Sequence, residues 1–148
     1  MSTGGPQRRG RERGLATAVE AAIVLPVMML LVGLVVVLAG RALAQQAVSG
    51  AAFAAARAAS LERTAGAADR AARDMAQVDL GSSRVTCESI TVGVDASGLA
   101  APRGAEAFVE VSVSCVAVFP VSLPGLPERA TLVGHGRSPV DTFRSRRG

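Results

Sequence analysis

The 148-residue sequence contains no Trp, no Tyr and no Lys, and it has only four Phe. A core without large rings must rely on Ala and Val, which bury little apolar area per residue, at about 25 cal/mol per Å². We therefore expect the folded part to be marginally stable alone. Both ends are rich in Arg, but they lack the stacking aromatics or folded motif of a nucleic-acid surface. No nucleic-acid partner is predicted.

Histidine is nearly absent as well: His135 is the only one, and glycines flank it on both sides. A single His without an identifiable partner cannot be assigned to a catalytic grouping, and a metal site would need more ligands. The glycines form no phosphate-binding pattern. The sequence predicts no enzyme, no catalytic residues, no metal and no cofactor.

Charge is missing from the segment Ala21–Gly40, a run of twenty residues. As a helix this run would be about 30 Å long, which matches the hydrocarbon core of a bilayer. Pro26 lies about one turn inside it, where a membrane helix tolerates a kink. We predict a transmembrane helix over residues 15–40, with the lipid bilayer as its partner.

The distribution of Arg around this segment predicts its orientation. Four Arg precede it closely, whereas only Arg41 follows it closely; the four are Arg8, Arg9, Arg11 and Arg13. The positive-inside bias predicts a single-pass protein of the cell membrane, its N-terminus cytoplasmic and its C-terminal domain extracytoplasmic. Residues 1–14 form a basic leader that we expect to be disordered until the membrane orders it.

The rest of the chain predicts an α+β fold. Residues 41–80 are rich in Ala, lack Pro and have the composition of a helix, with Gly66 as a candidate break, and this helix is expected to continue the membrane span as far as Ser60. Residues 83–135 then predict a small antiparallel β domain. Its strands are the alternating runs Val85–Val94 and Phe108–Phe119, with a short third strand at Arg129–Gly134. Residues 136–148 would form a basic flexible tail.

The two cysteines, Cys87 and Cys115, lie one on each predicted strand. Outside the cytoplasm such a pair most often forms one disulfide, whereas in the cytoplasm two free thiols would be expected. The first strand changes phase between Cys87 and Ile90. If Cys87 lies opposite Cys115, a β-bulge near Glu88 restores an apolar face, and beyond it Ile90 meets Val113, Val92 meets Val111 and Val94 meets Val109.

The junction before the apolar run has a distinctive pattern. Gly14 and Leu15 are followed by Val19–Glu20, then five residues, then Pro26 within the apolar run. This pattern, together with the Ala-rich stretch Ala51–Ala59, resembles the TadE-like family. These are pseudopilins or minor pilins of the tight-adherence (Flp-type) pilus system, with a pilin-like fold. The resemblance covers about residues 13–60.

The resemblance implies partners and processing. A prepilin peptidase would cut after Gly14, making Leu15 the first mature residue, and other pilin-like subunits and a pilus or secretion platform would be partners. Glu20 would pair with the new ammonium group of a neighbouring subunit, although it is the sixth mature residue here rather than the family's usual fifth. Small residues would permit close helix packing; they are Gly33, Gly40, Ala47, Gly50 and Ala51.

Three alternatives remain open. Glu20 could simply be solvated at the headgroup level, with no role in assembly. The sequence Ala42-Leu43-Ala44 is a signal-peptidase type of site, so residues 1–44 could be a signal peptide and the remainder a small secreted protein with one disulfide. The chain could also be an unprocessed membrane-anchored domain.

Overall fold

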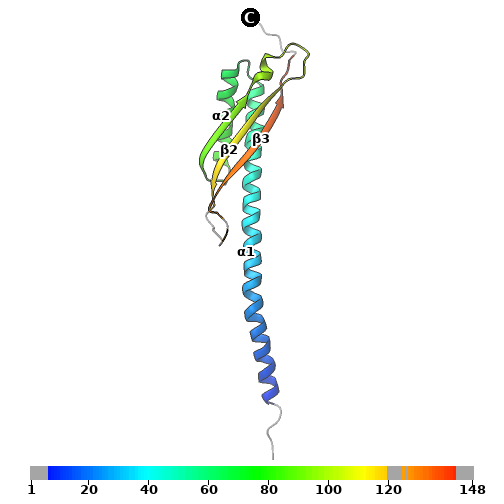
Figure 1. The fold of residues 1–148 in the computed structure, drawn as a ribbon, viewed down its shortest axis with the longest axis vertical. Helices are drawn as coiled ribbons and strands as arrows, with labels where there is room; N and C mark the ends of the chain where they lie inside the picture. Colours follow the sequence, from blue (N-terminus) through cyan, green and yellow to red (C-terminus); the bar gives the residue numbers. More distant parts are fainter. Residues whose placement is uncertain (1–6, 120–124, 126, 143–148) are drawn as a thin grey trace, which may run out of the picture. The chain divides into compact units, whose positions relative to one another are not determined.

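The computed structural model describes residues 7–119, 125 and 127–142, with side chains from Ala18 onward. The chain divides into two units, Met1–Ala39 and Gly40–Gly148. The element order is α1 (Gln7–Ser60), α2 (Ala65–Ser82), β1 (Cys87–Asp95), η1 (Ser97–Ala100), β2 (Phe108–Val118) and β3 (Arg129–Pro139) (Figure 1). The predicted α+β class, a long apolar helix followed by an antiparallel sheet in a pilin-like arrangement, is confirmed.

Helix α1 is continuous from Gln7 to Ser60, and Pro26 lies inside it without ending it. The expected continuity of the apolar run with the following helix is therefore confirmed. The backbone of residues 7–14 is also helical, and the role of the membrane in ordering this leader stays a prediction. The physical reason is that extending an existing helix avoids the cost of nucleation, and Arg, Gln and Glu are good helix formers.

The break between the two helices lies at residues 61–64, and not at Gly66, which is in the first turn of α2. Thr64 is the N-cap of α2, and its side-chain oxygen accepts a hydrogen bond from the backbone N–H of Ala67 at 3.2 Å. This bond satisfies one of the N–H groups that a helix start leaves without a partner. The capping residue, rather than the glycine, sets the helix boundary.

Helix α2 buries one stripe of small side chains, repeated every fourth residue: Ala68, Ala72, Ala76 and Leu80. Residues at this spacing share one face of a helix. Its exposed side carries the Asp69–Arg73 ion pair at 2.8 Å. The hydrogen bond from Arg73 lowers the pKa of the Asp69 carboxyl. The ion pair therefore lies on the solvated side of α2, away from the stripe that packs into the core.

The sheet has the order β1-β2-β3, and both pairings are antiparallel. Within the second unit, Figure 1 shows the sheet and α2 beside the C-terminal part of α1. Strand β2 buries alternate residues, as its sequence predicted; they are Val109, Val111, Val113, Cys115 and Ala117. They meet buried side chains from both helices, among them Val48 and Ala52 of α1. The core is thus formed mainly by Ala and Val.

The predicted bulge is present, because the β1–β2 register shifts between Cys87 and Ser89. The predicted register beyond it is wrong by two residues: Ile90 pairs with Cys115 rather than with Val113, Val92 with Val113 and Val94 with Val111. The prediction placed Cys87 opposite Cys115, whereas Cys87 pairs with Ala117 and the disulfide crosses the ladder diagonally. A shift of two preserves the alternation, so the apolar face stays the same.

Strand β3 is longer than predicted, since it ends at Pro139 rather than at Gly134. Residues 136–139, which we expected in the flexible tail, therefore belong to the sheet. The rest of the predicted tail from residue 143 lies outside the described residues. Gly134 and Gly136 resemble loop residues in the sequence, but both are buried in the strand. Their role becomes clear where β3 contacts α1.

Candidate functional site

The first part of α1 exposes apolar side chains in every direction around the helix. Exposed large residues recur from Val19 to Leu38, and the 18-residue apolar window in this helix has no buried residue. Among the described residues, this is the one helix long and apolar enough to cross a membrane. Exposing so much apolar surface to water would be costly. The helix is consistent with a single membrane span.

The residues predicted for processing and assembly all lie on this helix. The backbone of Gly14 and Leu15 is helical, the side chain of Glu20 is exposed, and Pro26 lies inside the helix. Pro26 is six positions after Glu20, which places them roughly 120° apart around the helix axis. The two therefore do not share a face, and a partner that contacts Glu20 approaches from a different side than Pro26.

From Gly40 onward α1 becomes two-sided. One face is buried by the sheet and α2: Ala44, Val48, Ala51, Ala52, Ala55, Ala56 and Ala59. The opposite face is exposed and includes Leu43, Gly50 and Phe53, the last with 58% of its surface accessible. Ala51, which we predicted to permit packing against another helix, is instead buried in this chain's own core. Gly33, Gly40 and Gly50 have open space where a side chain would stand.

Strand β3 lies directly on the backbone of α1. A Cβ atom added to Gly136 would stand 2.1 Å from the carbonyl oxygen of Ala52, and one added to Gly134 would stand 2.5 Å from that of Val48. Gln45 Nε2 donates to the Val133 carbonyl at 2.7 Å, and the hydroxyls of Ser60 and Ser138 are 3.0 Å apart. Close approach thus needs glycine at two alternate positions, a signal visible in Gly134-His135-Gly136.

The Cys87–Cys115 disulfide is confirmed, with Cα atoms 5.5 Å apart. Cys115 is fully buried, and Cys87 packs against the same core. The bridge joins the start of β1 to the centre of β2 across the bulge. It therefore covalently closes the sheet at the point where the regular ladder is interrupted.

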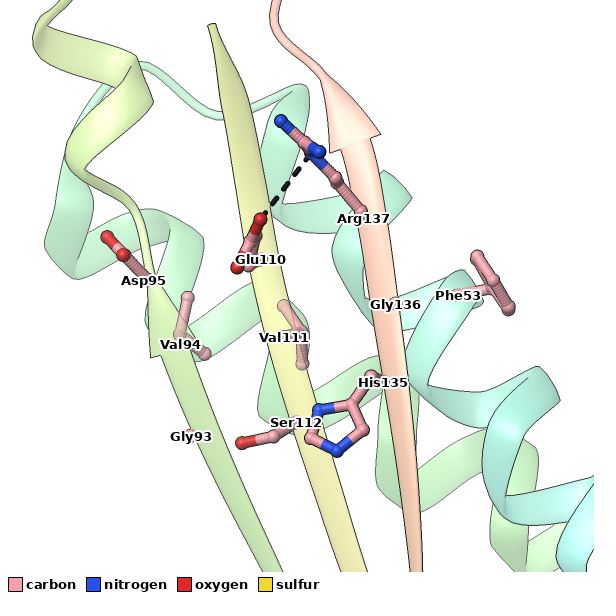
Figure 2. Close-up of a pocket in the computed structure, with 10 residues that line it drawn as sticks. All are labelled: Phe53, Gly93, Val94, Asp95, Glu110, Val111, Ser112, His135, Gly136 and Arg137. Atoms are coloured by element: carbon pink, nitrogen blue, oxygen red, sulfur yellow. Dashed lines mark ion pairs between the residues drawn. The ribbon is translucent and has the colours of Figure 1, made fainter.

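The outer face of the sheet is hollowed (Figure 2). Glu110 and Arg137 form an ion pair at 3.4 Å, and Arg137 also stacks on the ring of Phe108 at 3.7 Å from its centroid. Figure 2 shows His135 and Ser112 on neighbouring strands, where they are register partners. Within the described part of the chain, no three His, Cys, Asp or Glu residues are placed to hold a metal ion. The exposed ion pair contributes little stability.

Arg41 has contacts that its sequence position alone did not reveal. Its guanidinium carbon lies 5.1 Å from the centroid of the Phe119 ring, and Nη2 donates to the Pro127 carbonyl at 2.8 Å. The residue that follows the apolar run thus ties α1 to the connection between β2 and β3. The sequence shows only that Arg41 is the one charge close after the apolar run, because its contact with Phe119 depends on the tertiary fold.

One comparison with known proteins gives a match, to a family model that covers part of α1. Residues 16–57 match the family model described as TadE-like protein. Neither the comparison with curated proteins nor that with solved structures produced a match. The matched segment covers the exposed apolar part of α1 together with the part that packs on the sheet. The predicted resemblance to the TadE-like family is therefore confirmed over residues 16–57, which include Glu20 and Pro26.

Proposed function

We propose that this protein is a membrane-anchored pseudopilin or minor pilin, a structural component of a Tad/Flp-type pilus without enzymatic activity or a cofactor. The observation that carries the proposal is the coincidence of the TadE-like segment, residues 16–57, with an exposed apolar helix. A helix of this kind acts by packing in lipid and against other helices. Its partners are the bilayer, pilin-like subunits and the pilus assembly platform.

Two independent features support an extracytoplasmic location for the second unit. Four Arg precede the apolar run closely and only Arg41 follows it closely, so the positive-inside bias favours a cytoplasmic N-terminus. The Cys87–Cys115 disulfide favours the same topology, because disulfides persist in oxidising compartments. In this topology the sheet and α2 lie outside the cytoplasm, where a filament subunit would contact its neighbours.

Open glycines on α1 suggest where other subunits pack. A Cβ atom added to Gly33, Gly40 or Gly50 would meet nothing within 4 Å, so another helix can approach the backbone closely at these positions. Phe53 offers a large exposed ring on the same helix. Packing against a neighbouring subunit would bury this apolar surface, which the chain's own sheet does not cover.

Processing by a prepilin peptidase is part of the proposal. Cleavage after Gly14 would remove the basic leader and leave Leu15 with a free ammonium group. Glu20, the sixth residue of the mature chain, has an exposed side chain. Its carboxylate would form an ion pair with the N-terminal ammonium group of a neighbouring subunit. A carboxylate near a bilayer is costly unless it is solvated or paired. Pairing would fix the stagger of adjacent helices.

The competing function, a secreted protein released after Ala44, has a measurable signature. Ala44 is buried in the core and α1 passes through residues 42–44 without interruption. Cleavage there would cut this helix and remove Arg41, which contacts Phe119 and Pro127. The intact mass of the purified protein distinguishes the alternatives: loss of residues 1–14 supports the pseudopilin, loss of 1–44 the secreted protein, and a full chain an unprocessed anchor.

Replacing residues 18–39 with an unrelated poly-Leu span tests the function directly. The replacement should insert normally but abolish filaments, because it provides hydrophobicity without the Glu20 carboxylate and the Gly33 contact surface. Membrane fractionation and filament counts in a strain lacking the native protein are the readouts. The matched control returns Glu20 and Gly33 to the poly-Leu span. Normal filaments with plain poly-Leu would overturn assembly by helix packing.

A further inference from the structure

A groove opens in the second unit where the uncharged run Ala21–Gly40 ends. Three segments line it: residues 40–47 of α1, the connection 84–86 before β1, and residues 117–119 at the end of β2. It encloses about 470 Å³. Leu43, with 66% of its surface accessible, and the ring of Phe119 contribute apolar surface to it. The groove shares no lining residue with the hollow on the outer face of the sheet.

One arginine lines this groove, and a second, from a distant part of the sequence, contacts one of its lining residues. Arg84 lines it directly and has an exposed side chain. Arg41 does not line the groove, but its guanidinium carbon lies 5.1 Å from the ring centroid of Phe119, which does, and its Nη2 donates to the Pro127 carbonyl. Neither forms an ion pair with another described residue, whereas Arg73, Arg129 and Arg137 each have a carboxylate. The groove thus combines apolar surface with the positive charge of Arg84, and the charge of Arg41 lies next to it against Phe119.

We propose that this groove binds an anionic phospholipid, with the phosphate between Arg41 and Arg84 and apolar lipid surface against Leu43 and Phe119. Leu43 follows the end of the uncharged run by three residues along the same helix, so a bilayer whose hydrocarbon core covers that run would have its headgroup region near this groove. Arg holds phosphate by directional, charge-assisted hydrogen bonds. The inference rests on the membrane anchoring in the proposed function and adds a lipid class to it.

The test uses the full chain in nanodiscs made from equal parts phosphatidylglycerol and phosphatidylcholine. Lipid that stays bound after gentle release is identified by native mass spectrometry. We expect a several-fold excess of phosphatidylglycerol for the unaltered chain. Arg84→Gln and Arg41→Gln should each reduce that excess, and the double variant should abolish it. Arg103→Gln is the matched control, because it removes one exposed positive charge that does not line the groove.

Several outcomes would overturn the proposal. Equal retention of both lipids by the unaltered chain excludes an anionic lipid site. If Arg103→Gln loses as much of the phosphatidylglycerol excess as Arg84→Gln does, the excess reflects net charge and not binding in the groove. Crosslinking of Leu43→Cys to itself in nanodiscs, with no lipid retained, would assign the groove to a second copy of the chain. Circular dichroism and an intact disulfide verify that each variant is folded.

Filament assays separate this proposal from the proposed function. Selective lipid retention by a chain that builds no filaments would support the lipid site and contradict the pilin role. Filaments from a chain without lipid selectivity would support the pilin role and contradict the lipid site. A chain that fails to insert into nanodiscs would contradict both, because each requires a membrane span.

Discussion

Gly134 and Gly136 decide how closely β3 packs on α1. Their missing side chains allow the strand to lie against the carbonyls of Val48 and Ala52. Neither glycine has a positive φ, so the requirement is space rather than backbone freedom. The sequence alone shows only a glycine-flanked His, which is equally typical of a loop, and this is why our predicted third strand ended too early.

Gly136→Ala should destabilise the second unit by about 1–3 kcal/mol, because the new Cβ overlaps backbone that cannot move freely. Thermal unfolding of the full chain in detergent, followed by circular dichroism, should show a decrease in Tm. Gly50→Ala is the matched control: no atom lies within 4 Å of its added Cβ. This control should raise stability by about 0.5–1 kcal/mol, since Ala favours helix over Gly. Equal effects of the two substitutions would refute the steric explanation.

Removing the disulfide should cost about 2–4 kcal/mol, since the bridge restricts the unfolded chain over a separation of 28 residues. The double variant Cys87→Ser/Cys115→Ser should unfold at lower urea concentration than the unaltered chain. Dithiothreitol should lower the midpoint of the unaltered chain and leave the double variant unchanged. A midpoint insensitive to reductant in both proteins would contradict a stabilising bridge.

At the scale of the element, the start of α2 depends on Thr64. Thr64→Ala removes the acceptor for the Ala67 N–H and should lower stability by about 1 kcal/mol. Thr64→Ser keeps the hydroxyl and should restore most of the loss. Urea unfolding of both variants provides the measurement. A Ser variant as unstable as the Ala variant would show that the methyl group, and not the cap, matters.

In β1 and β2, the alternation of apolar residues predicted the bulge but not the register. The phase change between Cys87 and Ile90 correctly predicted a bulge near Glu88, because an alternating face cannot change parity without an inserted residue. The same reasoning missed the register by two, since it assumed that bridged cysteines lie directly opposite. A bulge brings Cys87 within 5.5 Å of a residue diagonal to it, and alternation cannot distinguish registers that differ by two.

For α1, the sequence predicted the extent of the helix but not the face that it buries. A charge-free run and an Ala-rich continuation without Pro were enough to predict one helix as far as Ser60. The face that α1 buries could not be read from them, because Ala occupies nearly every side of the helix between Ala51 and Ala59. The sheet selects that face, and the contacts of Gly134 and Gly136 define it. Phe53 is exposed because it lies on the face of α1 that the sheet does not cover.

At the scale of the whole molecule, Glu20→Ala separates membrane insertion from assembly. Removing a charge near the bilayer should leave insertion intact or ease it. Co-purification with other pilin-like subunits should decrease if Glu20 pairs with a neighbour's ammonium group. Glu20→Asp, which keeps the charge, is the control and should retain part of the interaction. Undiminished co-purification of the Ala variant would assign Glu20 to simple solvation.

The proposed topology predicts where a reporter fused after Gly148 will work. Alkaline phosphatase, which needs an oxidising compartment, should be active in this fusion, and green fluorescent protein exported in the same position should not fluoresce. Changing the four leader arginines to Gln should weaken this bias, since those charges favour a cytoplasmic N-terminus. Reporter activity confined to the cytoplasm would reverse the orientation and place the disulfide in a reducing compartment.

Gln45 on α1 and Val133 on β3 are 88 residues apart in the chain, yet they are joined by a hydrogen bond. A chain that crosses a membrane in order, first helix first, therefore exposes the Ala-rich face of α1 until its last strand has emerged. The disulfide spans only 28 residues and can join β1 to β2 before then. In the proposed topology, the disulfide would therefore form early during export, and β3 would pack on α1 last. Translation that stops before Pro139 would release a chain already crosslinked but still uncovered along α1.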